Sequence, residues 1–212
     1  MRVFFLTGSD TDVGKTYLIS QLIQHLQSLG LKALAIKPIE TGVNPIAHDA
    51  NIHLKNAQKL FPTLTLQDIT LYTFPLPASP FVADERGVIE CERIFSHISS
   101  FEGKVDILIV EGAGGLFVPI KKDYFMLDFA LELQERLMSE VVFVCDDRLG
   151  MINRLLSGVH ILQSKKLLYH LLINIREEKT FQKLSSPFLQ VWGERYYTSH
   201  KAIADELLGK FQ

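Results

Sequence analysis

Apolar residues along the chain fall into two patterns. Short uninterrupted runs rich in Val, Ile, Leu and Phe predict buried strands. These runs lie at residues 3–6, 31–37, 106–111, 141–145 and 167–174. Between them, longer stretches repeat an apolar residue every three or four positions and predict helices. The helical stretches follow residue 15 and lie around residues 49–60, 90–99, 125–138, 150–163 and 200–210.

This alternation of strands and helices indicates the fold class. Nearly continuous apolar strands belong to sheets that are buried on both faces, and such sheets are typically parallel. We therefore predict an α/β fold, a parallel β-sheet flanked by helices on both faces, in a single domain spanning residues 1–212. Ligands of such sheets bind at the carboxyl ends of the strands, so the polar residues after each strand are the functional candidates.

The turn after the first strand carries the strongest functional signal. Residues 7–16 read Thr-Gly-Ser-Asp-Thr-Asp-Val-Gly-Lys-Thr and lie between a strand and a helix, the context of a phosphate-binding loop. Main-chain N–H groups of such a turn converge on an anion at the positive end of the helix dipole. Gly14 permits close backbone approach, Lys15 reaches the outer phosphates, and the Thr16 hydroxyl is placed for Mg²⁺. The loop predicts nucleoside triphosphate binding and a P-loop NTPase-like fold, although Ser9 replaces the glycine of the common, shorter pattern.

Polar residues also follow three other strands. Lys37, Glu40 and Thr41 are expected to place a cation, a carboxylate and a hydroxyl beside the nucleotide. Glu111 ends a hydrophobic strand and precedes a glycine-rich turn, like the acidic residue that holds Mg²⁺ in phosphate-loop enzymes. Residues 146–147, two aspartates, precede a helix and either line the site or cap that helix.

Composition excludes several classes of function. A net charge of −2 and a pI near 6.4 argue against nucleic-acid binding and a polybasic membrane anchor. No apolar run approaches the roughly 20 residues of a membrane span, and the first run is too short for a signal peptide. Cys91 and Cys145 form no disulfide framework and fit a reduced, cytoplasmic protein. His48 and His53 flank Asp49, but no Cys/His cluster has zinc spacing, and we expect solvated or packed histidines.

Three motifs together resemble the dethiobiotin synthetase family, whose members close the ureido ring in biotin synthesis with ATP. The motifs are residues 7–16, Lys37-Pro38 with Thr41-Gly42, and Val110-Glu111-Gly112-Ala113-Gly114-Gly115, and residues 149–153 also look like the family's later helix start. The longer phosphate loop is the family's own form. The resemblance runs from residue 1 to about residue 175 and thins beyond that point.

The resemblance implies a substrate, a cofactor and roles for particular residues. One amine of 7,8-diaminononanoate takes up CO₂ (or bicarbonate) as a carbamate, the carbamate attacks the γ-phosphate of ATP, and the second amine closes the ring. Lys37, Lys15 and Thr11 are the implied catalytic residues. The implied nucleotide ligands are Asp12, Val13, Gly14, Lys15, Thr16, Tyr17, Glu111, Gly112, Ala113, Gly114 and Asn174. Thr41, Thr11, Lys37, Gly150 and Asn153 are implied for the substrate, and Thr16, Asp49 and Glu111 for Mg²⁺.

The family also implies a homodimer with a composite active site. The start of a helix from the partner chain receives the substrate carboxylate, and here that helix begins around residues 149–153. Neither a nucleic acid nor a membrane is an expected partner.

Two departures from the family concern the purine pocket. Asn174 matches the family's adenine-contacting asparagine, but residues 175–177 (Ile-Arg-Glu) replace those that usually follow it. The family's Gly-x-Ile-Pro strand and turn is absent near the C-terminus, where residues 188–193 lie roughly in its place. We therefore predict weak nucleotide binding with relaxed base choice. The alternative is that an aromatic side chain rebuilds the wall by stacking; the candidates are Trp192, Tyr196 and Tyr197.

Two other functions share this loop. A partitioning or septum-site switch ATPase usually carries an extra lysine early in the loop, where this chain has Ser9, Asp10 or Thr11. A small-molecule kinase is the nearest enzymatic rival, although no Arg-rich lid is evident. A GTPase is disfavoured because residues 174–177 lack the lysine and aspartate that read guanine.

Overall fold

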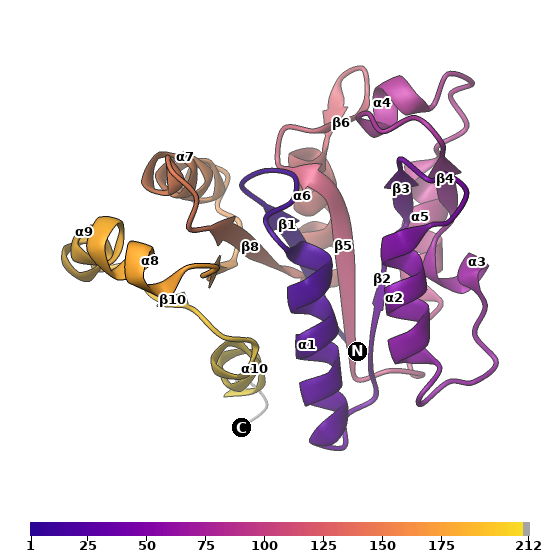
Figure 1. Cartoon of the computed structure of the whole chain (residues 1–212). Coiled ribbons are helices and arrows are strands. Elements are labelled where there is room, and N and C mark those ends of the chain that lie inside the picture. Colours follow the sequence, from indigo (N-terminus) through magenta and orange to yellow (C-terminus); the bar gives the residue numbers. More distant parts are fainter. Residues whose placement is uncertain (210–212) are drawn as a thin grey trace.

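A six-stranded parallel sheet forms the centre of the computed structural model, which describes residues 1–209 (Figure 1). The strand order is β10-β9-β8-β1-β5-β2. The strands are β1 (Arg2–Gly8), β2 (Ala33–Ile36), β5 (Ile107–Gly115), β8 (Glu140–Asp146), β9 (Tyr169–Asn174) and β10 (Tyr196–Tyr197). β1 lies between β5 and β8, so the phosphate loop that follows β1 emerges near the middle of the sheet.

Ten helices and two small sheets complete the described part of the chain. The helices are α1 (Lys15–Ser28), α2 (His48–Ala57), α3 (Leu66–Ile69), α4 (Pro80–Ala83), α5 (Cys91–Ser99), α6 (Met126–Leu137), α7 (Met151–Ser164), α8 (Glu178–Leu184), α9 (Ser186–Trp192) and α10 (His200–Leu208). The small sheets pair β3 (Ile39–Thr41) with β4 (Tyr72–Phe74) and β6 (Pro119–Lys121) with β7 (Tyr124–Phe125).

Both faces of the central sheet are buried, as predicted. Successive side chains of a strand point to opposite faces, and this separates the apolar residues of β1 into two cores. Phe4 and Leu6 pack with apolar residues of α1 and α10, whereas Val3 and Phe5 pack with those of α5, α6 and α7. Figure 1 shows α1 crossing in front of the sheet and α6 behind it. The predicted parallel α/β architecture is therefore confirmed.

Some predicted boundaries are wrong. The strand expected at residues 31–37 is limited to β2, and the strand expected to end at Glu111 continues through Gly115, which pairs with Gly8 of β1. The helix expected at residues 200–210 ends at Leu208, and residue 210 lies outside the described residues. The short strands and the helices α3, α4, α8 and α9 were not predicted, since elements of two to seven residues show little periodicity.

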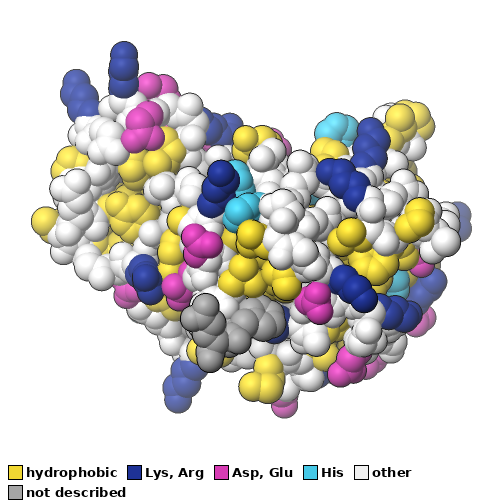
Figure 2. Space-filling model, turned by 90° about the horizontal axis from the view of Figure 1, so that it is seen from below, with side chains coloured by type: hydrophobic (Ala, Val, Ile, Leu, Met, Phe, Trp, Pro, Cys, Tyr) yellow, Lys and Arg dark blue, Asp and Glu magenta, His cyan; other side chains and the backbone are white. Residues whose placement is uncertain are grey.

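The surface at the amino ends of the strands carries mixed charge. Figure 2 shows this face, which lies at the bottom of Figure 1, with basic and acidic side chains interspersed among apolar and neutral groups. Such a surface does not favour a polyanionic partner there. Among residues 1–209, no helix combines the length and apolar composition needed to cross a membrane.

Candidate active site

The phosphate loop joins β1 to α1 in a conformation that its residues impose. Gly14 precedes α1 with a φ of 92°, and Asp12 adopts a φ of 56°, so two residues of the loop are left-handed. A Cβ atom at Gly14 would lie 2.2 Å from Nδ2 of Asn174, so only glycine fits there. The loop is anchored to β8 because the Ser9 N–H donates to the Val144 carbonyl at 2.7 Å.

Lys15 is the first helical residue after this loop and is buried. Its Nζ atom donates to the Asp10 carbonyl at 3.4 Å. Burial lowers the pKa of Lys15 below its ordinary value; the carboxylate of Glu111 opposes this shift, and the nearby charge of Lys37 adds to it. The charge on Lys15 is therefore incompletely balanced within the protein, and a phosphate anion at the loop would stabilise it.

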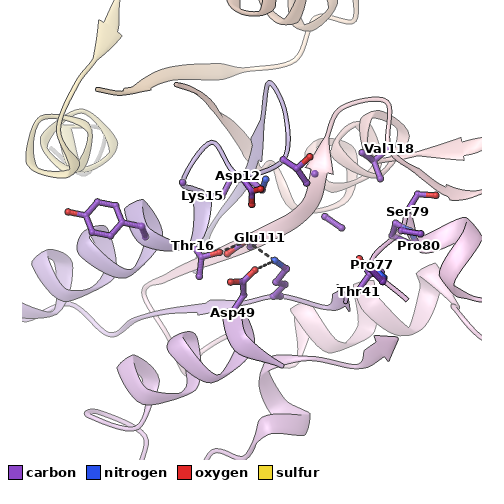
Figure 3. A pocket seen from close by; sticks show the side chains of 17 residues that line it. Asp12, Lys15, Thr16, Thr41, Asp49, Pro77, Ser79, Pro80, Glu111 and Val118 are labelled. Carbon is purple, nitrogen blue, oxygen red and sulfur yellow. Dashed lines mark hydrogen bonds and ion pairs between the residues drawn. The ribbon is translucent and has the colours of Figure 1, made fainter. Parts of the chain in front are cut away.

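Glu111 on β5 is the centre of a buried ionic cluster (Figure 3). Its Oε1 atom accepts from Lys37 Nζ and from Thr16 Oγ1, both at 2.9 Å. Lys37 Nζ also donates to Asp49 Oδ2. Lys37, Asp49, Thr16 and Glu111 come from different elements, and the parallel sheet brings them together because β1, β2 and β5 are neighbours.

The charges in this cluster stabilise one another. Burial alone would raise the pKa of Glu111, but Lys37 and His53 outweigh it and hold that pKa well below its ordinary value. Burial would likewise lower the pKa of Lys37, and the carboxylates of Glu111 and Asp49 instead raise it. Lys37 is therefore a fixed cation and Glu111 a fixed anion at neutral pH.

Two residues that support the cluster were not identified as such from the sequence. His53 on α2 is packed, as expected, but its Nε2 atom also lies 2.7 Å from Glu111 Oε2. Glu40 does not face the nucleotide cavity as predicted. Its carboxylate instead accepts the N–H groups of Asp49 at 3.0 Å and Ala50 at 2.9 Å, because the unpaired amides at the start of α2 attract an anion. Glu40 thereby positions the helix turn that carries Asp49.

A cavity of about 670 Å³ opens above this cluster. Most of the predicted site residues line it, namely Thr11, Asp12, Gly14, Lys15, Thr16, Tyr17, Lys37, Thr41, Asp49, Glu111, Ala113 and Gly114. Val13 and Gly112 do not line the cavity. Val13 is buried in the core, and Gly112 packs so closely against the Phe5 ring that a Cβ atom there would collide with it. Asn174 contacts the loop from outside, where its Nδ2 atom donates to the Val13 carbonyl at 2.9 Å.

The remaining predicted residues lie at the start of α7. Gly150 precedes this helix with a φ of 84°, and Asn153 lines a second cavity of about 460 Å³. Thr11 and Gly114 border both cavities, so only the loop and the end of β5 separate them. The structure therefore brings the predicted phosphate and metal residues together in one place and leaves Gly150 and Asn153 outside it.

Comparison with known proteins finds relatives that align with nearly the whole chain. Residues 2–189 match the family described as AAA domain. The ATP-dependent dethiobiotin synthetase of Wolinella succinogenes is 39% identical over 201 residues, covering 92% of this chain and 90% of the relative. That of Sulfurovum sp. is 41% identical over 192 residues, covering 89% and 90%. The chain belongs to the ATP-dependent dethiobiotin synthetase family. It is an ATP-dependent ligase.

Solved structures support the fold of this synthetase family member. The MinD cell division protein of Aquifex aeolicus aligns with a TM-score of 0.54 at 16% identity, covering 92% of this chain and 80% of that protein. At this identity the likeness shows the fold alone. The chain therefore shares the parallel α/β fold of that protein, as the sequence predicted.

The region expected to hold the purine is built mainly from helices. Residues 188–193 lie roughly where the family has its strand and turn; here they form the last part of α9, which ends at Trp192, and Gly193 after it. Trp192 stacks on Phe188 with ring centroids 6.2 Å apart, and this pairing ties the indole to its own helix. Tyr196 and Tyr197 form β10 at the edge of the sheet.

We expect relaxed base choice from this region. A pocket rejects analogues strongly only when its buried polar groups would be left unpaired, and the Asn174 amide already donates to the loop. GTP and CTP should therefore support measurable turnover, with weak nucleotide binding that depends mainly on the triphosphate. The values of kcat/KM for ATP, GTP and CTP test this. A preference for ATP over GTP above about a thousandfold, roughly 4 kcal/mol, would show that a dedicated adenine site exists.

Proposed function

We propose that this chain makes dethiobiotin from 7,8-diaminononanoate, CO₂ and ATP through a carbamate and a carbamic–phosphoric anhydride, releasing ADP and phosphate. The observation that carries the proposal is the cluster of Lys15, Lys37 and Glu111 in the cavity at the phosphate loop, in a member of the dethiobiotin synthetase family. Lysine side chains at this place suit a reaction whose intermediates are anionic.

The proposed reaction proceeds in three steps. One amine of the substrate loses a proton and adds to CO₂, which gives a carbamate. A carbamate oxygen then attacks the γ-phosphorus of ATP, the bond to the β–γ bridging oxygen breaks, and ADP leaves. Finally the second amine attacks the carbonyl carbon and loses a proton to solvent, the ring closes, and phosphate leaves with the electrons of the broken C–O bond.

Lys15 and Lys37 are the proposed catalytic residues of these steps. Phosphoryl transfer requires positioning and stabilisation of negative charge rather than covalent help from the protein. Lys15, at the start of α1, lines the cavity and is proposed to reach the outer phosphates, and Lys37, held by Glu111 and Asp49, faces the same cavity. Thr11 and Thr41 line that cavity and are the proposed contacts of the carbamate and the diamine.

Mg²⁺ is part of the proposal, and the residues present fit it. Mg²⁺ uses one or two carboxylates together with phosphate oxygens, and Glu111, Asp49 and the Thr16 hydroxyl provide such oxygens around one point. The Lys37 ammonium already lies between the two carboxylates, so this place stabilises positive charge. When bound, Mg²⁺ neutralises charge on the phosphoryl group that is transferred.

A homodimer with a composite site is also proposed. The N–H groups at the start of α7 suit an anion, and Leu149 beside them is 95% exposed, as expected of an apolar residue that a second chain covers. Asn153 of the partner would donate to the substrate carboxylate. We place this enzyme in the cytoplasm, as its cysteine content favours.

We expect Asn153→Ala to raise the KM for the diamine by about tenfold to a hundredfold, because a hydrogen bond to a charged group contributes about 1.5–3 kcal/mol. Ser164→Ala, at the opposite end of the same helix, is the matched control and should leave this KM unchanged. Sedimentation should show a dimer. A stable monomer, or an Asn153→Ala variant with an unchanged KM, would count against the composite site.

Phosphate release distinguishes the proposed ligase from its rivals. With MgATP and bicarbonate, release should depend on the diamine. Release that is indifferent to the diamine would instead indicate a switch ATPase. Transfer of the phosphate to a stable phosphorylated product, without free phosphate, would indicate a kinase.

A further inference from the structure

Asp146 at the end of β8 is the centre of a second ionic cluster, outside the catalytic cavity. Its side chain is fully buried and faces three arginines. Oδ2 accepts from Arg148 Nε and lies 3.4 Å from Arg176 Nη2, while Oδ1 accepts from Arg154 Nη2 at 2.9 Å. Asp146 therefore does not cap α7, which begins at Met151 after Gly150 and has no side-chain cap. The second alternative drawn from the sequence, a cap by residues 146–147, is wrong.

Two of these arginines also donate hydrogen bonds to the phosphate loop. Arg148 Nη2 donates to the carbonyl of Thr11 at 3.3 Å, and Arg176 Nη2 donates to the carbonyl of Asp12. The next carbonyl, that of Val13, accepts from Asn174. Three consecutive carbonyls of the loop are thus held from outside by Asn174 at the end of β9 and by arginines that follow β8 and β9.

Asp147 fixes the direction from which Arg176 approaches. Its Oδ2 atom accepts the main-chain N–H groups of Arg176 at 3.0 Å and of Glu177 at 2.9 Å. The turn after β9 is therefore locked to the turn after β8. Residues 175–177 are the ones that depart from the family pattern, and their arginine turns to the phosphate loop.

We propose that Asp146, Arg148 and Arg176 are positioning residues that hold the phosphate loop in its anion-binding shape. A phosphate cradle presents its N–H groups to the ligand, so the carbonyls of the same peptide units point away and need partners of their own. Charged donors on successive carbonyls keep the N–H groups directed inward before the nucleotide arrives. The half-exposed arginines are themselves oriented by the buried carboxylate of Asp146.

The proposal rests on the proposed nucleotide site but not on the ligase reaction, so nucleotide binding alone tests it. Arg176→Met keeps the length and apolar stem of the side chain and removes its donors. Arg195→Met is the matched control, because Arg195 is an exposed arginine that pairs with Glu206 on α10. Binding of MgATP, MgADP and adenosine to each purified variant is measured by titration, and thermal unfolding shows that the variants are folded.

We expect Arg176→Met to weaken MgATP and MgADP alike by about tenfold to a hundredfold, since small displacements of positioned groups have effects of this size. Adenosine binding and the Arg195→Met variant should stay within twofold of the parent chain. Unchanged MgATP binding in Arg176→Met would overturn the proposal. An equal loss of adenosine would place Arg176 at the base instead, and a loss confined to MgATP would make it a direct γ-phosphate ligand; either result overturns it.

Discussion

The variant Lys37→Ala is expected to turn over about 10²–10³ times more slowly than the parent chain, because it loses one preorganised contact to developing negative charge. Lys37 Nζ lies 2.9 Å from Glu111 Oε1 and is buried beside the phosphate loop, so its charge is fixed where we propose that the carbamate meets the γ-phosphate. Nucleotide affinity should change little, since the loop and Lys15 remain. The measurement is kcat from steady-state phosphate release, together with the Kd of MgATP.

The control for this variant is Lys55→Ala, which removes an exposed lysine from α2, the helix that carries Asp49. Loss of a buried ion-pair partner destabilises proteins by about 3–5 kcal/mol, so the thermal unfolding of Lys37→Ala must be recorded and the assay run where the variant is folded. If folded Lys37→Ala stays within a few-fold of the parent kcat, the catalytic role of Lys37 is wrong.

Glu111→Gln is expected to cause a second large loss, again about 10²–10³ in turnover. Glu111 touches Thr16, Lys37 and His53, and it is the proposed Mg²⁺ ligand with the firmest position. Asp49→Asn should have a smaller effect, because Asp49 is partly exposed. Both losses should shrink as the Mg²⁺ concentration rises, which kcat/KM measured across a magnesium titration will show.

Glu135→Gln, an exposed position on α6, controls for the loss of one carboxylate and should match the parent. A magnesium dependence of Glu111→Gln identical to that of the parent chain would remove Glu111 from the metal site.

The pH dependence of folding stability offers an independent check on Glu111, because the pKa of its carboxyl group is lowered in the folded chain. Its stabilising contribution is therefore complete above its ordinary value of 4.5 and is lost as the pH falls toward the lowered folded value.

The convergence of the proposed phosphate-site residues could be predicted from the sequence, because it follows from local patterns and parallel topology. Lys37 and Glu111 each follow or end an apolar run, and the carboxyl ends of parallel strands meet at one edge of the sheet. Their convergence with Thr16 could therefore be expected before their distances were known. The alternation of apolar side chains of β1 between the two buried faces of the sheet also follows from the two-residue period of a strand.

The supporting contacts could not be predicted in the same way. His53 reaches Glu111 across 58 positions of the chain, and nothing in the residues around His53 marks it as different from a packed histidine. The sequence predicts Glu40 as a cavity carboxylate, but both of its oxygens accept N–H groups at the start of α2. The contact of Arg176 with the loop depends on the turn after β9, which has no periodic pattern. The contacts of His53, Glu40 and Arg176 all depend on tertiary geometry that local sequence patterns do not encode.

The most direct test of the proposed reaction follows the carbon atom that closes the ring. Enzyme in excess is mixed with 7,8-diaminononanoate, MgATP and ¹³C-bicarbonate, and the products are analysed by mass spectrometry alongside a phosphate assay. We predict dethiobiotin that carries the label in its ureido carbon, formed in an amount equal to the phosphate released. Phosphate or a phosphorylated diamine that accumulates without labelled dethiobiotin would contradict the account.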